Sequence, residues 1–101
     1  FYTIYKYQAG VTGAFGMTSK PYRIWFDGEF VAWEDARVHL LTHTLHYGLA
    51  AFEGIRAYRC SDERSAVFRL PEHVDRLYAS AHIARIEIPF TKEETHNAII
   101  E

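Results

Sequence analysis

Asp27-Gly28 separates two short runs of aromatic and β-branched residues, at 24–26 and 30–33. This arrangement is a strong local signal for a β-hairpin, because glycine accepts the positive φ that a type I′ turn requires. We therefore predict an antiparallel hairpin over residues 24–33. A chain that begins its folded part in this way favours antiparallel sheets over a doubly wound parallel sheet.

A second hairpin is predicted farther along the chain. Residues 55–58 and 66–70 have strand patterns, and a polar, charged turn over residues 60–65 separates them. Between the two hairpins we expect a polar turn at 34–37 and a short strand at 38–41. A helix should then start at Thr44 and end at Gly54, since glycine accepts the left-handed conformation that often ends a helix.

Two helices are predicted in the last third of the chain. Pro71 suits the first turn of a helix, where its missing N–H costs nothing. The apolar residues of this helix recur at i, i+3, i+4 and i+7, the spacing of a stripe that packs against a sheet: Val74, Leu77, Tyr78 and Ala81. Thr91 and Glu94 have capping-box spacing, so another helix should begin near Lys92. The sequence predicts an α+β fold, a small two-layer domain of antiparallel hairpins with helices packed on one face.

The length and the net charge of the chain exclude several classes of function. The 101 residues form at most one ordinary domain, which is marginal alone and would benefit from a partner. Eleven basic and thirteen acidic side chains give a net charge of -2, unlike the positive field of a general nucleic-acid binder. No apolar run approaches a membrane span. The single cysteine, Cys60, cannot form an internal disulfide, which favours a reducing compartment; we expect the cytoplasm.

We expect that neither end of the sequence is a natural terminus. The sequence starts at Phe1, and Met17 is its only methionine, so we expect the natural start at Met17. Residues 1–16 carry no targeting signal, and an extra N-terminal strand followed by a linker is the alternative. The final helix stops at Glu101 with apolar residues still to be covered, which suggests a piece of a longer polypeptide.

Several groups of reactive residues are better explained by structural roles than by metal binding or catalysis. His39, His43 and His46 would form a metal site only on one continuous helix, and residues 38–41 have a strand pattern. Cys60 lies beside a cation that favours a thiolate, although an ordinary position at a strand end is the better interpretation. The acidic pairs lie in turns or in a first helical turn, where solvated roles are expected: Glu34-Asp35, Asp62-Glu63 and Glu93-Glu94.

Arg76 is more informative, because it falls opposite the apolar stripe of its helix, on the same side as Ile83. An apolar residue on a solvent face is unexpected, so a ligand or further protein would cover this side, and the guanidinium could hold phosphate oxygens. A water-facing Arg76 paired with Glu72 remains the alternative. In residues 46–58, Arg56 could recognise a carboxylate in an aromatic pocket, whereas ordinary core packing would explain the aromatic residues equally well.

Residues 20–101 resemble the N-terminal small domain of the branched-chain amino acid aminotransferases, a group of class IV, pyridoxal-phosphate-dependent enzymes. The resemblance is carried by IWFDGEFVAWEDARVHLLTHTLHYGLAAFEGIRAY and VFRLPEHVDRLYASAHIARIEIPFT. HYG followed by FEGIRAY is typical of the branched-chain group. EHVDRLYASA is shared with D-amino-acid aminotransferases and, more loosely, with aminodeoxychorismate lyases. Residues 1–19 lie outside the resemblance and form a separate N-terminal extension.

The resemblance implies a role for five residues. Arg76 matches the arginine that binds the phosphate of pyridoxal 5′-phosphate. Tyr47 and Phe52 match residues around the substrate side chain, with Tyr47 reaching the site of a partner subunit. Gly54 matches a backbone position close to the ligand, and Arg56 an arginine near the substrate carboxylate.

The implied reaction is transamination between leucine, isoleucine or valine and 2-oxoglutarate, in a homodimer or larger oligomer. The chain contains only Lys6, Lys20 and Lys92, none in the context of the family's Schiff-base lysine. That lysine would belong to a large C-terminal domain beyond residue 101, so the chain alone should be inactive. The alternatives are a D-amino-acid aminotransferase or aminodeoxychorismate lyase on the same scaffold, and a non-catalytic binding or assembly module.

Overall fold

Residues 3–4, 23–26 and 29–32 form a small antiparallel sheet in the computed structural model, which describes residues 3–4 and 23–101. Strands β2 (Arg23–Phe26) and β3 (Glu29–Ala32) pair with Trp25 opposite Phe30. The turn between them has φ of 50° at Asp27 and 102° at Gly28. Positive φ at both central residues is the geometry of a type I′ turn, so the predicted hairpin is confirmed.

A third strand, β1 (Thr3–Ile4), pairs with the free edge of β2, with Thr3 opposite Phe26. The sheet order is β1-β2-β3. The alternative of an extra N-terminal strand is therefore confirmed over these two residues. The expected start at Met17 lies outside the described residues.

The connection between the hairpins departs from the prediction. A 3-10 helix, η1 (Trp33–Asp35), and a short helix, α1 (His43–Tyr47), replace the polar turn and the longer helix. Residues 38–41 form no strand, because the amide and hydroxyl of Thr42 donate to the His39 carbonyl at 3.0 and 2.6 Å and turn the chain back. The helix ends at Gly48, not Gly54: Gly48 has φ of 64° and donates to the Thr44 carbonyl.

The second hairpin is confirmed with shifted ends. Strands β4 (Ala57–Arg59) and β5 (Ser65–Val67) pair with Tyr58 opposite Ala66. The amide of Cys60 donates to the Arg64 carbonyl at 2.7 Å and closes the turn. Cys60 is exposed at this strand end, as the plainer interpretation expected.

Helices α2 (Leu70–Ile83) and α3 (Lys92–Ile100) enclose the main core. The capping box at the start of α3 is confirmed, with the Thr91 side chain accepting from the Glu94 amide and the Glu94 side chain accepting from the Thr91 amide. Leu70 and Val74 pack against Ile99, and this cluster is extended by partly buried residues from the neighbouring elements: Ile55, Val67 and Tyr78. The apolar stripe of α2 thus faces α3 as well as β5, although a sheet alone was predicted to cover it.

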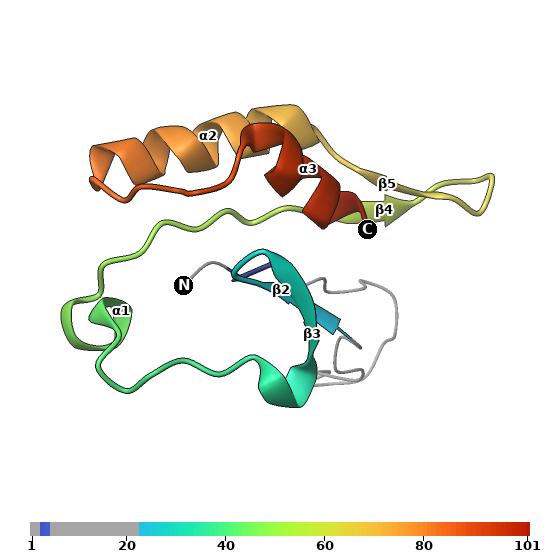
Figure 1. The fold of residues 1–101 in the computed structure, drawn as a ribbon. Coiled ribbons are helices and arrows are strands. Elements are labelled where there is room, and N and C mark those ends of the chain that lie inside the picture. The colour runs from blue at the N-terminus through green and yellow to red at the C-terminus, as the bar shows by residue number, and fades with distance from the viewer. Residues whose placement is uncertain (1–2, 5–22) are drawn as a thin grey trace, which may run out of the picture.

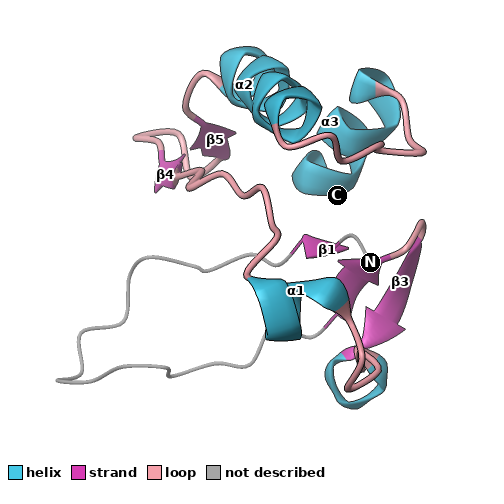
Figure 2. Ribbon diagram, turned by 90° about the vertical axis from the view of Figure 1, so that its left-hand side faces the viewer, coloured by secondary structure: helices cyan, strands magenta, loops and turns pink. Residues whose placement is uncertain are grey.

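Aromatic contacts connect the hairpin to the helical part. The rings of Trp25 and Phe90 meet edge to face with centroids 4.8 Å apart, and a Cβ on Gly28 would lie 3.1 Å from the Phe90 ring. Figure 1 shows α2 and α3 side by side, on the opposite side of the molecule from β2 and β3. The segment after α1 leads from the hairpin side to β4 and the helices (Figure 2). Hairpins with helices segregated from them confirm the α+β fold.

The longest helix in the described ranges is α2, with 14 residues. None of the helices there combines the length and the hydropathy needed to cross a bilayer.

Candidate functional site

A fork of two hydrogen bonds joins Arg76 to Glu53. The Nε and Nη2 atoms of Arg76 donate to Oε1 and Oε2 of Glu53, both at 2.6 Å. The two residues are 23 positions apart in the sequence. Paired, charge-assisted bonds of this kind fix both the direction and the plane of a guanidinium.

His73 completes the cluster from the same helix. Its Nδ1 lies 2.8 Å from Oε2 of Glu53, and since a carboxylate only accepts, Nδ1 carries the hydrogen. The Glu53 side chain is only 7% exposed beneath these two partners. The hydrogen bonds from Arg76 hold the pKa of Glu53 at about 2, below its ordinary 4.5, while burial acts in the opposite direction. Glu53 is therefore ionised at neutral pH.

The local sequence explains how the cluster forms. His73 and Arg76 are three residues apart on α2, so both side chains lie on one face of the helix. Glu53 lies in the irregular segment between α1 and β4, two residues before Ile55, which packs against the Leu70–Val74–Ile99 core. Burial of Ile55 thus holds the carboxylate of Glu53 beside α2.

The alternative pairing of Arg76 with Glu72 is wrong. Glu72 accepts from Arg69 Nε at 3.0 Å instead, and its pKa is lowered chiefly by a backbone hydrogen bond at the helix start. The Arg76 side chain stays 64% exposed even though it is bonded to Glu53. Within residues 23–101, Nη1 of Arg76 makes no hydrogen bond, so one edge of the guanidinium remains available to an anion.

The residues predicted to surround a substrate are exposed, and the structure brings only some of them together. Phe52 and Gly54 flank Glu53, the partner of Arg76, in the sequence. Phe52 is 86% exposed, and Tyr47 at the end of α1 is 80% exposed, with its ring centroid 5.8 Å from that of His43. Arg56 immediately precedes β4, and its carbonyl accepts from the Phe68 amide. The segment predicted for the substrate and the helix predicted for phosphate therefore meet at Glu53.

The histidines form no metal site. His39 Nδ1 accepts from the Leu41 amide at 3.1 Å, and His46 Nε2 lies 3.0 Å from the Leu40 carbonyl. No group of three or more His, Cys, Asp or Glu side chains in the described ranges is arranged to hold a metal ion.

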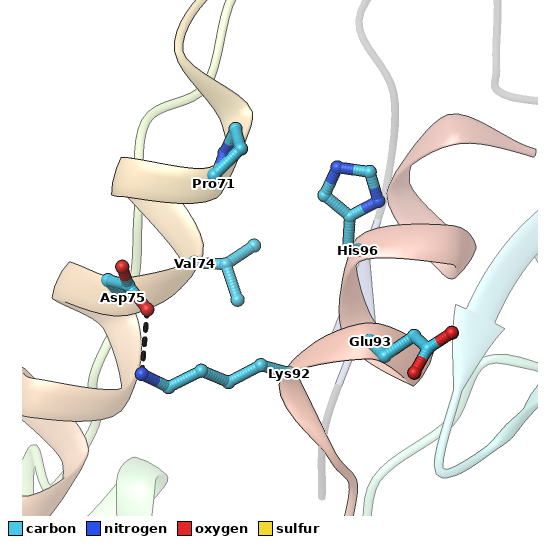
Figure 3. A pocket seen from close by; sticks show the side chains of 6 residues that line it. All are labelled: Pro71, Val74, Asp75, Lys92, Glu93 and His96. Carbon is cyan, nitrogen blue, oxygen red and sulfur yellow. Dashed lines mark hydrogen bonds and ion pairs between the residues drawn. The ribbon is translucent and has the colours of Figure 1, made fainter.

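A pocket between α2 and α3 lies apart from these candidates (Figure 3). It is lined by six residues of the two helices: Pro71, Val74, Asp75, Lys92, Glu93 and His96. Lys92 Nζ donates to Asp75 Oδ1 at 2.6 Å across its mouth, so these two charges neutralise each other. The pocket therefore offers no unpaired charge from this pair to a ligand.

Comparison with known proteins identifies the family of this segment. No protein-family model matches the chain. The branched-chain-amino-acid aminotransferase of Pseudomonas aeruginosa is 53% identical over 75 residues, which are 74% of this chain and 24% of that protein. The corresponding enzyme of Escherichia coli K12 is 48% identical over 81 residues, 80% of this chain and 26% of that protein.

A solved structure of a relative agrees in fold. The T.th. branched-chain amino acid aminotransferase, in complex with N-(5′-phosphopyridoxyl)-L-glutamate, matches with a TM-score of 0.76 and 51% identity over 79% of this chain and 26% of that chain. Over this segment, the chain belongs to the branched-chain aminotransferase family. It spans about a quarter of the length of the curated relatives it matches.

Glu53 is the residue of this aminotransferase segment that sequence reasoning missed. A signal for it was present, because it is the only acidic residue in positions 46–60. His73 and Arg76 lie on one face of a helix, where an acidic residue from another segment can bond to both.

Proposed function

We propose that the protein containing this chain is a pyridoxal-phosphate-dependent transaminase that exchanges amino groups between branched-chain L-amino acids and 2-oxoglutarate. The observation that carries the proposal is the exposed Arg76 guanidinium, fixed by a buried carboxylate, in a segment 48–53% identical to branched-chain aminotransferases. The T.th. relative binds a compound that joins a phosphopyridoxyl group to glutamate, which supports both the cofactor and the acidic co-substrate.

Arg76 would bind the cofactor phosphate. Its Nη1 group has no bond to the described residues and can donate to phosphate oxygens, whereas Nη2 donates to Glu53 and lies 3.3 Å from His73 Nδ1. This donor set fits the phosphate group, although one arginine supplies only some of the donors that a phosphate accepts. When bound, pyridoxal phosphate supplies an electron sink for the reaction.

The substrate would lie beside the segment that carries Glu53. Phe52 and Tyr47 would form an apolar wall around the branched side chain and exclude water from it. Arg56 would bind the substrate carboxylate, and Gly54 would let the ligand approach the backbone. These roles require that the side chains of Phe52 and Tyr47, exposed here, be covered in the working site.

The proton-transferring lysine would come from outside residues 1–101. Lys92 is paired with Asp75, and the other lysines of the sequence, Lys6 and Lys20, do not lie in the context of the family's Schiff-base lysine. We propose that a large domain supplies this lysine, that residues 20–101 act as the small domain with residues 1–19 as an extension, and that the chain alone is inactive. The cytoplasm is the proposed location.

A further domain and a second subunit would cover the exposed apolar surface. Between η1 and β4, large apolar side chains face outward: Val38, Leu40, Leu41, Leu45, Tyr47, Leu49 and Phe52. Many exposed large apolar side chains in one segment are typical of a surface that another part of a protein covers. This supports a homodimer or larger assembly in which the small domain packs against other parts of the enzyme.

An assay of the full-length protein tests the proposed reaction. Transfer of the amino group from L-leucine, L-isoleucine or L-valine to 2-oxoglutarate is expected. Activity confined to D-alanine would reject the branched-chain assignment in favour of a D-amino-acid aminotransferase. Release of pyruvate from aminodeoxychorismate would indicate the lyase, and a natural protein without any of these activities would indicate a binding module.

Phe52→Ala should lower kcat/KM for L-leucine by about 10- to 100-fold in the full-length enzyme, because the ring that would cover the substrate side chain is lost, and even one methylene of apolar contact in such a pocket is worth about 1–3 kcal/mol. The effect on L-glutamate should be within about threefold, because the charged side chain of glutamate gains little from an apolar wall. Steady-state kinetics with both substrates measures the ratio. Equal losses for leucine and glutamate would contradict the pocket role of Phe52.

A further inference from the structure

We propose that Glu53 is a positioning residue that aims Arg76 at the phosphate of the cofactor. The inference rests on the proposed function of Arg76 and adds a residue for which neither the motifs nor the comparisons give a role. Two elements meet at this point: the segment after α1 supplies Glu53, and one face of α2 supplies Arg76 and His73.

The geometry divides the guanidinium into two edges. Glu53 occupies the Nε–Nη2 edge with two bonds of 2.6 Å, and the Nη1 side is left for a ligand. An exposed arginine otherwise samples many rotamers, and ordering it on binding costs free energy. A carboxylate that fixes the side chain beforehand removes much of that cost, so the phosphate meets donors that are already in place.

Glu53 is itself held firmly enough to act in this way. Its side chain is 7% exposed, His73 Nδ1 donates to it at 2.8 Å, and Ile55 anchors its backbone in the core. Arg76 and Lys92 differ in this respect. Lys92 pairs with an Asp75 side chain that is 65% exposed, so burial does not hold its partner in place.

The charge of Glu53 allows an opposing hypothesis, in which Glu53 competes with phosphate for Arg76. Glu53 cancels the charge of Arg76, so a carboxylate that merely competed with phosphate for the guanidinium would weaken cofactor binding. Removing its charge would then strengthen the binding. Positioning and competition therefore predict changes of opposite sign.

Glu53→Gln in the full-length apoprotein separates these outcomes. Glutamine keeps the size but has only one acceptor oxygen, so its NH₂ group would face either the Arg76 or the His73 donor. We expect the Kd of pyridoxal 5′-phosphate, from absorbance titration, to rise about three- to tenfold. The Kd of pyridoxal, which lacks the phosphate, should stay within about twofold, a selectivity that general structural damage would not give.

Glu72→Gln is the matched control. Glu72 lies on the same helix and pairs with the exposed Arg69, so its substitution should leave both Kd values unchanged. If Glu53→Gln does not fold, Glu53→Asp, which keeps the charge but shortens the reach, should weaken pyridoxal 5′-phosphate binding in the same direction. Unchanged or tighter binding of pyridoxal 5′-phosphate by the folded Glu53 variant overturns the inference.

The variant Arg76→Ala shows whether a negative result with Glu53→Gln overturns only the role of Glu53 or also the proposed phosphate role of Arg76. If Arg76→Ala weakens pyridoxal 5′-phosphate binding and Glu53→Gln does not, Arg76 binds phosphate without help from Glu53. If neither variant weakens the binding, the phosphate role of Arg76 itself is wrong.

Discussion

Arg76→Ala is expected to raise the Kd of pyridoxal 5′-phosphate by about 10- to 100-fold in the full-length protein. The physical reason is the loss of charge-assisted hydrogen bonds, each worth about 1.5–3 kcal/mol to a charged group, with about 1.4 kcal/mol corresponding to tenfold in affinity. Absorbance titration of the apoprotein measures the change. Affinity within about twofold of the unaltered protein would contradict the phosphate role.

Two further variants isolate the cause of this loss. Arg76→Ala also removes the principal partner of Glu53, a carboxylate that is 7% exposed, and part of the effect could come from local destabilisation. The double variant Arg76→Ala/Glu53→Gln removes that uncompensated charge, and its affinity should stay low if the guanidinium acts on the phosphate. Arg76→Lys keeps the charge but not the fork, so its affinity should lie between those of the alanine variant and the unaltered protein.

Leu70→Ala should lower the free energy of unfolding of the part of the protein formed by α2 and α3 by about 2–5 kcal/mol, as expected when a buried leucine is truncated and a cavity remains. Leu70 is 4% exposed and packs with Val74 and Ile99 in the largest cluster of the described core. Denaturant unfolding, monitored by hydrogen exchange of α2 and α3 amides, measures the local change.

Leu70→Met is the matched control, since it nearly conserves volume and should cost less than about 1.5 kcal/mol. Because Ile55 packs on the same cluster, loss of Leu70 should also loosen the segment that carries Glu53. Protection of the α2 and α3 amides that is equal in Leu70→Ala and Leu70→Met would show that this cluster does not hold the two helices together.

The elements that the sequence predicted correctly are set by neighbouring residues. The Asp27-Gly28 turn and the Thr91–Glu94 capping box depend on contacts within a few positions, and both formed as expected. The strand at 38–41 was wrong because an alternating pattern does not reveal that Thr42 bonds back to His39. Two glycines could end the helix after Thr44, and the chain uses the earlier one, Gly48.

The central contact of the candidate site joins residues that are far apart along the chain, so neighbouring residues do not specify it. The helical pattern correctly separated Arg76 from the apolar stripe, but it offered Glu72 as a partner only because the two residues are four positions apart on the helix. The true partner, Glu53, is brought to α2 by the packing of Ile55 on the core. Such a pairing depends on the tertiary arrangement, and a single sequence contains no periodicity that specifies it.

The low pKa of Glu53 makes the stability of this part of the molecule depend on pH in acid solution. A carboxyl whose pKa falls from 4.5 to about 2 on folding favours the folded state fully above about pH 5, and this contribution is lost progressively as the pH falls from about 5 to about 2. The charge of the Glu53–Arg76 pair is consequently the same in mildly acidic and in alkaline solution. Ionisation of Glu53 is therefore not a source of pH dependence in this contact near neutrality.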